Sequence, residues 1–292
     1  MTSKNLRNPP SSFGAAGFVL LGAFLIQWSA AIIQPAFALI GPAASSGWRF
    51  LAGAVALLFV ARPRIRSWTS KQWTGVFALG LSSAFMNLCF YQAIQRIPLG
   101  TAVAIEYLGP FLVAALGKRT WRHFGFVALA SLGVLALARP GGNLTLVGAL
   151  FAAGSGVGWA AYALSSHRLG DVTDGFGGLA VAMTVASVAT FGFLAPSLTH
   201  VVSSPGLLFR VALVGVMATA LGFGAEMQAL RRVKPSVVGV LLALDPAVAF
   251  LVGFVILRQT VKPLDFVGLV CVVVSGIGVT LDATRVMLEP AR

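Results

Sequence analysis

The sequence predicts an all-α membrane protein with ten transmembrane helices. Of its 292 residues, 58% are hydrophobic, and it holds only 21 Lys and Arg and 8 Asp and Glu. The mean hydropathy is +0.90. A helix needs about 20 apolar residues to cross about 30 Å of hydrocarbon, and the apolar residues fall into stretches of roughly that length. A water-soluble core of this size would not absorb so much apolar surface, so a bilayer is expected around the chain.

The predicted helices follow one another with short connections that carry turn signals. Gly41-Pro42, Arg139-Pro140-Gly141-Gly142 and Ser204-Pro205-Gly206 are examples of such connections, and Gly and Pro are the strongest local breaks in a helical pattern. No connection leaves room for a soluble domain. The ten predicted helices span residues 13–33, 44–61, 73–94, 98–117, 121–138, 144–167, 175–196, 207–230, 234–257 and 264–283.

The net charge of +13 reflects membrane topology and does not indicate nucleic-acid binding. No basic run is long enough to follow a phosphate backbone, whereas membrane proteins concentrate Lys and Arg in cytoplasmic loops. With the N-terminus in the cytoplasm, fifteen Lys and Arg fall on the inner side and six on the outer side. This bias predicts an even number of spans and two cytoplasmic termini. The six outer residues are Arg49, Arg96, Arg139, Arg210, Arg258 and Lys262.

The sequence contains no pattern typical of a metal, a cofactor or an enzyme. Cys89 and Cys271 both lie in apolar stretches and are interpreted as small core residues, and the three histidines are scattered. There is no phosphate-binding loop of the Gly-x-x-x-x-Gly-Lys-Ser/Thr type, no His-Glu-x-x-His motif and no Ser/His/Asp set at a shared depth. The chain is therefore predicted to be neither an ATP-driven pump nor an enzyme.

The two halves of the chain resemble each other. Gly17 and Trp28 recur 131 positions later as Gly148 and Trp159, and further on the displacement is 136, as in Pro110 and Pro246. The repeats are expected to occupy residues 1–140 and 141–292. Five helices per repeat is an odd number, so the second repeat must enter the membrane inverted, which is an architecture typical of carriers that work by alternating access around a midplane site.

Three segments resemble a known transporter family. They are YQAIQRIPLGTAVAIEYLGP at 91–110, Trp48-Arg49-Phe50, and EMQAL from Glu226. They are similar to the threonine/homoserine exporters of the EamA-domain branch of the drug/metabolite transporter superfamily, a branch that also includes aromatic amino-acid exporters. The resemblance implies a ten-helix, multi-pass exporter of the bacterial inner membrane. This chain departs from that group at Asp245, where a glutamate is usual.

Three acidic residues fall within the predicted spans, where a charge is costly and needs an explanation. Glu106 lies near the centre of the fourth span and Asp245 near the centre of the ninth. Pro110 and Pro246 interrupt these helices, and Pro110 removes the amide that would bond the carbonyl of residue 106. Two interpretations of these acids stay open: binding of a proton or of the substrate amine, or a structural bond to a neighbouring helix. Glu226 is interpreted as structural, pairing Arg231 near the cytoplasmic end.

Polar and aromatic residues recur on single helix faces and predict a cavity lining. Examples are Asn87 and Tyr91 on the third helix and Trp159 and Tyr162 on the sixth. Trp28 is the repeat equivalent of Trp159, so the two are expected to face each other. The alternative interpretation of the serines in these stripes is ordinary helix packing. The predicted substrate-binding residues are Trp28, Asn87, Tyr91, Glu106, Trp159 and Tyr162, with proton coupling assigned to Glu106 and Asp245.

Other residues at the predicted membrane boundaries are read as anchors. Arg49 either attracts a substrate carboxylate or extends to the lipid headgroups, which is the commoner role of such an arginine. Trp48, Trp68, Trp73 and Trp121 are interpreted as interfacial residues.

The expected function is secondary export of neutral amino acids, threonine/homoserine-like or aromatic, by alternating access. The expected partners are a small-molecule amino acid, the lipid bilayer and, if transport is coupled, protons; no nucleic acid is expected. Efflux of drugs or other metabolites is the alternative within transport, and an enzyme acting on lipid carriers is a distant alternative. The choice between threonine-like and aromatic substrates, between proton antiport and facilitated diffusion, and the oligomeric state stay open.

Overall fold

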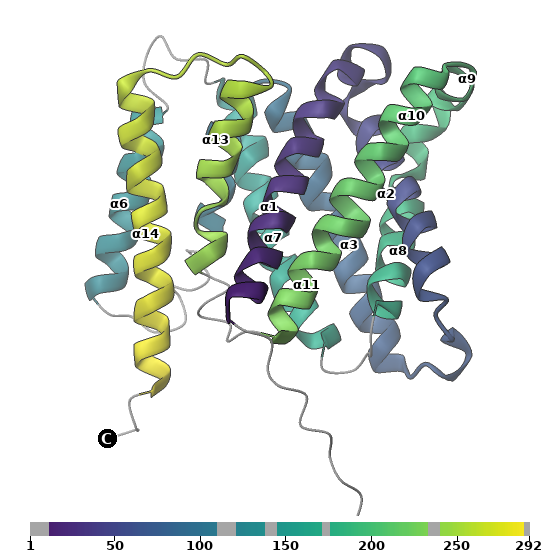
Figure 1. The fold of residues 1–292 in the computed structure, drawn as a ribbon, viewed down its shortest axis with the longest axis horizontal. Coiled ribbons are helices and arrows are strands. Elements are labelled where there is room, and N and C mark those ends of the chain that lie inside the picture. Colours follow the sequence, from purple (N-terminus) through teal and green to yellow (C-terminus); the bar gives the residue numbers. More distant parts are fainter. Residues whose placement is uncertain (1–11, 110–120, 138–144, 171–175, 233–239, 289–292) are drawn as a thin grey trace, which may run out of the picture.

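Every element of the computed structural model is a helix, and no strand occurs within the part of the chain that it describes, residues 12–109, 121–137, 145–170, 176–232 and 240–288 (Figure 1). The α-helices are α1 (Ser12–Ile33), α2 (Phe37–Ala61), α3 (Ser70–Ile94), α4 (Leu99–Glu106), α6 (Trp121–Leu137), α7 (Leu146–Gly170), α8 (Gly177–Leu194), α9 (Leu198–Ser203), α10 (Pro205–Val214), α11 (Phe223–Arg232), α13 (Asp245–Val255) and α14 (Pro263–Leu288). Short 3₁₀ turns cover Gln34–Ala36, Ile65–Ser67 and Ala195–Ser197, and a π-helical stretch, Gly215–Gly222, joins α10 to α11.

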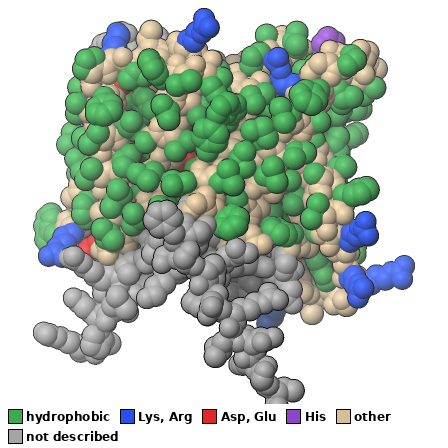
Figure 2. Space-filling model, in the orientation of Figure 1, with side chains coloured by type: hydrophobic (Ala, Val, Ile, Leu, Met, Phe, Trp, Pro, Cys, Tyr) green, Lys and Arg blue, Asp and Glu red, His purple; other side chains and the backbone are tan. Residues whose placement is uncertain are grey.

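The protein is a multi-pass helical membrane protein. Six helical stretches among the described residues are long and apolar enough to cross a membrane: Gly17–Ala61, Ser70–Ile94, Leu146–Ser166, Gly177–Ser203, Pro205–Gln228 and Pro263–Asp282. Hydrophobic side chains cover the visible flank, while Lys and Arg lie near its two ends (Figure 2). Two large apolar side chains, Phe59 and Val188, are 77% and 70% exposed. Such large apolar side chains are stable at the surface when lipid surrounds it.

Helices from the two halves of the chain pair across the molecule. Helix α3 packs against α7, α1 against α11, α2 against α8, α4 against α13, and α6 against α14. The start of α1 and the end of α14 lie at the same end of the helical layer (Figure 1). The core is therefore assembled from long-range contacts between residues before and after the middle of the chain.

Two irregular segments shape the helices around the centre. Gly41 has φ 79° and ψ 159° and breaks α2 just before Pro42, a conformation that glycine adopts without a steric penalty. The π-helical stretch packs against α2, where a Cβ on Gly215 would lie 2.7 Å from the carbonyl oxygen of Arg49. Such π-helical segments often occur at functional sites.

The observed helices follow the predicted ranges with informative differences. Helix α1 begins and ends within one residue of the prediction, whereas α2 begins at Phe37, seven residues earlier than expected. In the ninth predicted span, residues 240–242 are helical and α13 then starts at Asp245, with Pro246 in its first turn. In the fourth, α4 ends at Glu106. Pro110 lies outside the described residues.

Candidate functional site

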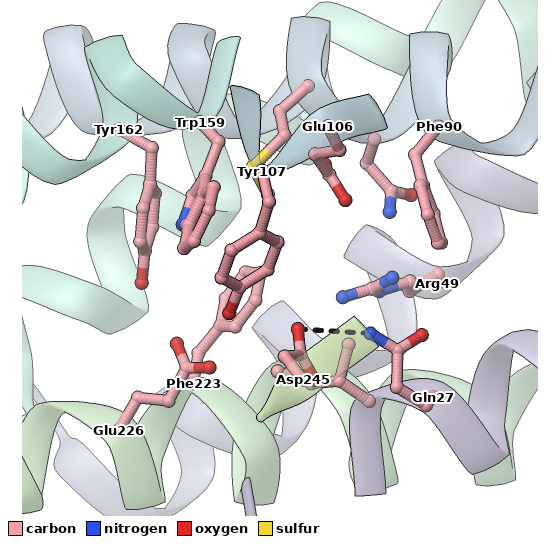
Figure 3. A pocket seen from close by; sticks show the side chains of 13 residues that line it. Gln27, Arg49, Phe90, Glu106, Tyr107, Trp159, Tyr162, Phe223, Glu226 and Asp245 are labelled. Carbon is pink, nitrogen blue, oxygen red and sulfur yellow. Dashed lines mark hydrogen bonds between the residues drawn. The ribbon is translucent and has the colours of Figure 1, made fainter. Parts of the chain in front are cut away.

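A partly open cavity lies between the two halves of the chain, and about 510 Å³ of space, open solvent included, is unfilled by atoms there. Helices α1, α2, α3 and α4 line it from the first half, and α7, α11 and α13 from the second (Figure 3). The lining residues are Ile26, Gln27, Arg49, Met86, Asn87, Phe90, Glu106, Tyr107, Trp159, Tyr162, Phe223, Glu226 and Asp245.

Glu106 reaches the cavity from the last turn of α4, where α4 crosses α7 closely. A Cβ on Gly156 would lie 2.5 Å from the carbonyl oxygen of Glu106, so only glycine fits at the crossing. The neighbouring Ser155 hydroxyl bonds to the Glu106 carboxylate and also lies 2.9 Å from the carbonyl oxygen of Met86. A hydroxyl has one proton and two lone pairs, so Ser155 donates to one of these groups at a time.

Asp245 is held at the start of α13 by a residue from the other half of the chain. Gln27 Nε2 donates to Asp245 Oδ2 over 3.1 Å (Figure 3). The oxygen of the same amide, Gln27 Oε1, is buried and accepts no hydrogen bond from the described residues. Tyr107 lies beside the pair and donates its hydroxyl proton to the carbonyl of Leu242. The arrangement holds the carboxylate in the first turn of a helix, the end that favours negative charge.

Aromatic side chains form another wall of the cavity. The ring centroids of Tyr107 and Trp159 are 4.3 Å apart, and those of Tyr162 and Phe223 are 5.4 Å apart. Glu226 projects from α11 beside this wall (Figure 3). The sequence predicted Glu226 to be a structural partner of Arg231 near the cytoplasmic end, and the structure places its carboxylate in the lining of the cavity. The side chain of Arg231 lies outside the described part.

Arg49 projects into the same cavity from α2. Its side chain is only 1% exposed, and its Nε donates to Thr219 Oγ1 of the π-helical stretch over 3.3 Å. The guanidinium carbon lies 5.4 Å from the centroid of the Phe223 ring and 5.8 Å from that of Tyr91. The expected headgroup position is wrong for Arg49. It is also wrong for Trp48, which is 6% exposed and donates to Ser197, because α8 and its following turn cover this face of α2.

The structure brings five predicted site residues together at the cavity: Asn87, Glu106, Trp159, Tyr162 and Asp245. Trp28 lies elsewhere, because it is 37% exposed and packs edge-on against Phe24 at 4.6 Å. The expected facing of Trp28 and Trp159 is not observed. Tyr91 is fully buried behind the lining, 5.3 Å from the ring of Phe37.

Two charged lining residues, Arg49 and Glu226, were not assigned to the site by the sequence. A signal for both was present, because an ionisable residue at membrane depth is a candidate for function. For Arg49 the depth was misjudged, because α2 begins seven residues earlier than expected. The apolar lining residues Ile26, Met86, Phe90 and Phe223 carry no such signal, since similar residues occur on every face of these helices.

Comparison with known proteins decides the family. The EamA-like transporter family matches residues 13–138 and again residues 146–281. The chain belongs to the EamA-like transporter family. Within it, the threonine/homoserine exporter RhtA of Salmonella typhimurium (strain SL1344) is 30% identical over 270 residues, 91% of each chain. RhtA of Escherichia coli (strain K12) is 31% identical over 268 residues, 89% of each chain.

Two further comparisons of this EamA-family protein are more distant. The uncharacterized transporter YvbV of Bacillus subtilis (strain 168) is 24% identical over 277 residues, 88% of this chain and 89% of its own. A crystal structure that is 19% identical in sequence superposes over 92% of this chain and 98% of its own, with a TM-score of 0.59. That likeness concerns the fold alone.

Proposed function

We propose that this protein exports neutral amino acids, threonine/homoserine-like or aromatic, from the cytoplasm across the bacterial inner membrane. The observation that carries the proposal is the 30–31% identity to threonine/homoserine exporters over about nine-tenths of both chains. The cavity agrees with such a cargo, because it combines charged and amide groups for an amino-acid head with an aromatic wall for a side chain.

The proposed architecture is ten transmembrane helices in two inverted five-helix repeats, residues 1–140 and 141–292. The helix pairing supports it, because α1 packs on α11 as α3 packs on α7. In the proposed repeat, α1 corresponds to α7 and α3 to α11, so these two contacts exchange under a twofold axis. The pairs of α2 with α8, α4 with α13 and α6 with α14 each join equivalent helices. Rocking of the halves about that axis would open the cavity to either side in turn.

Both termini are proposed to lie in the cytoplasm. The start of α1 and the end of α14 share one end of the helical layer (Figure 1). The basic residues of the loops, fifteen against six in the sequence, are expected at that end.

Glu106 is the proposed site of proton exchange, and its hydrogen bonds suit that role in both charge states. When the carboxylate is ionised, it accepts the proton of the Ser155 hydroxyl. When Glu106 is protonated, it donates to Ser155 Oγ, and Ser155 then donates to the Met86 carbonyl 2.9 Å away. In both states the Ser155 hydroxyl and the Glu106 oxygen that it contacts stay hydrogen-bonded to each other, which avoids the cost of an unpaired buried group. Asp245 is the second proposed proton-binding group.

Efflux of labelled threonine, homoserine and phenylalanine from proteoliposomes tests the proposal. We expect Glu106→Gln and Trp159→Ala to lower efflux. Trp28→Ala is a matched control, because Trp28 is 37% exposed and lies outside the cavity lining. Comparison of efflux with and without a pH gradient then separates antiport from facilitated diffusion. Normal rates in both cavity variants would refute the assigned site, and absence of amino-acid efflux in the wild-type protein would refute the function.

A further inference from the structure

A buried arginine with unused hydrogen-bonding capacity points into the cavity. Arg49 is 1% exposed, and its Nε donates a hydrogen bond to Thr219 Oγ1. Figure 3 shows the guanidinium directed into the cavity, with Glu106 on one side and Gln27 and Asp245 on the other. The two terminal nitrogens therefore face the space that a substrate would occupy.

Among the described residues, no acid of the cavity lies within ion-pair distance, 4.0 Å, of the Arg49 guanidinium. The ion pair observed among the described residues joins Arg122 and Asp282 over 4.0 Å, on helices α6 and α14 and far from this site. Glu106 is engaged by Ser155, and Asp245 by Gln27. These neutral partners hold the carboxylates in place without consuming the arginine. A buried guanidinium that is not paired is costly, so an anionic partner entering the cavity gains a favourable interaction there.

We infer that Arg49 binds the α-carboxylate of the transported amino acid, an inference that rests on the proposed function and deepens it. The planar guanidinium presents parallel N–H donors that match the two oxygens of a carboxylate. The aromatic rings of Phe223 and Tyr91, 5.4 and 5.8 Å from the guanidinium carbon, hold the cation in one orientation.

This orientation of the guanidinium also places the ammonium group and the side chain of the substrate. With the carboxylate on Arg49, the ammonium group lies toward the acceptor oxygens of Glu106 and Asp245, which flank the guanidinium (Figure 3). The substrate side chain is then directed along the wall that begins at Phe223 and continues to Tyr162, 5.4 Å away. The site thus requires a molecule that carries a free carboxylate and a free amine together.

This requirement distinguishes amino acids from amines and from amino acids with a blocked carboxyl group. A cavity in which three acidic side chains acted alone would accept any small cation. With Arg49 unpaired at its centre, an amide, a methyl ester or a decarboxylated amine leaves the guanidinium buried without an anion. Such analogues are therefore excluded by a lost interaction rather than by size.

Counterflow competition in proteoliposomes tests the inference on the wild-type protein. Uptake of labelled threonine is measured against unlabelled threonine, threonine amide and threonine methyl ester, and uptake of labelled phenylalanine against phenylalanine, its amide and phenethylamine. We expect each blocked or decarboxylated analogue to compete at least about tenfold more weakly than its parent amino acid, because a charge-assisted bidentate contact is lost. Equal competition by the amides would overturn the assignment of Arg49.

Variants locate the effect at the arginine. Arg49→Gln is expected to weaken competition by the amino acids at least about tenfold while leaving competition by the amides unchanged, and Arg49→Lys to retain part of the preference. Arg66→Gln, at an exposed position between α2 and α3, is the control and should behave as wild type. An unchanged preference in Arg49→Gln overturns the inference. Absence of amino-acid counterflow in the wild type refutes the proposed function instead, and with it the inference.

Discussion

Substitution of Gly156 by alanine tests the close crossing of α4 and α7 that holds Glu106 in the cavity. An alanine Cβ at this position would lie 2.5 Å from the carbonyl oxygen of Glu106 and 3.3 Å from the amide nitrogen of Gly109. Ordinary contacts begin at 3.4 Å, so α4 and α7 must separate by about 0.9 Å at this point. The obstructing atoms belong to the backbone, and a change of side-chain rotamer gives no relief.

The expected cost is about 1–3 kcal/mol in the free energy of unfolding, as for other insertions into a well-packed core. Gly154→Ala is the matched control on the same helix. Its Cβ would meet only the side chain of Cys89, with Sγ at 3.3 Å. The gain from replacing a helical glycine is common to both variants, about 0.4–1 kcal/mol. The difference between them therefore measures the crossing itself.

Unfolding in a denaturing detergent, followed by tryptophan fluorescence, measures the difference in stability, and threonine efflux measures the effect on transport. We expect Gly156→Ala to unfold at lower denaturant and to export more slowly, because the contact of Ser155 with Glu106 is displaced with α4. Gly154→Ala should be at least as stable as the wild type and should export threonine at the wild-type rate. If the two variants are equally stable and equally active, the crossing does not constrain the site as described.

Two further predictions concern polar contacts between the halves of the chain. Gln27→Leu removes the 3.1 Å hydrogen bond to Asp245. It should lower the free energy of unfolding by about 1–3 kcal/mol, because a buried carboxylate oxygen loses its donor. A variant that unfolds at the same detergent concentration as the wild type would contradict this. Gln259→Ala removes the acceptor of the Leu99 amide at the start of α4, 3.1 Å away. The free energy of unfolding should fall by about 1 kcal/mol, as for the loss of other helix caps. Gln259→Glu keeps an acceptor and should retain most of the stability in the same titration.

Helix positions were largely predictable because the bilayer imposes one local requirement. A stretch long and apolar enough to cross it must be helical, whatever its neighbours are. The range expected at 13–33 therefore agrees with α1, Ser12–Ile33, and that at 175–196 with α8, Gly177–Leu194. The start of the second helix was wrong, because Gly41 and Pro42 were taken as a loop before the helix, whereas α2 begins at Phe37 and is only interrupted there.

That error explains why Arg49 was assigned to the membrane boundary. Arg49 lies eight residues beyond the break at Gly41, about 12 Å along the helix axis at 1.5 Å per residue. For Trp28 the predicted helix face was wrong. The repeat predicts its depth, but its ring is on the outer face of α1, while Gln27, the preceding residue, faces the cavity. Adjacent residues of a helix point about 100° apart, so depth alone does not select the lining residue.

The sequence by itself determined that the chain is helical, crosses a membrane, and carries Glu106 and Asp245 at a depth where a charge must have a purpose. Only the tertiary structure decided that these acids share one cavity with Glu226 and Arg49. The physical reason is that crossing the bilayer depends only on the length and apolar character of one local segment. The rotation and crossing of helices are instead set by contacts between distant residues, such as that of Gly156 with Glu106.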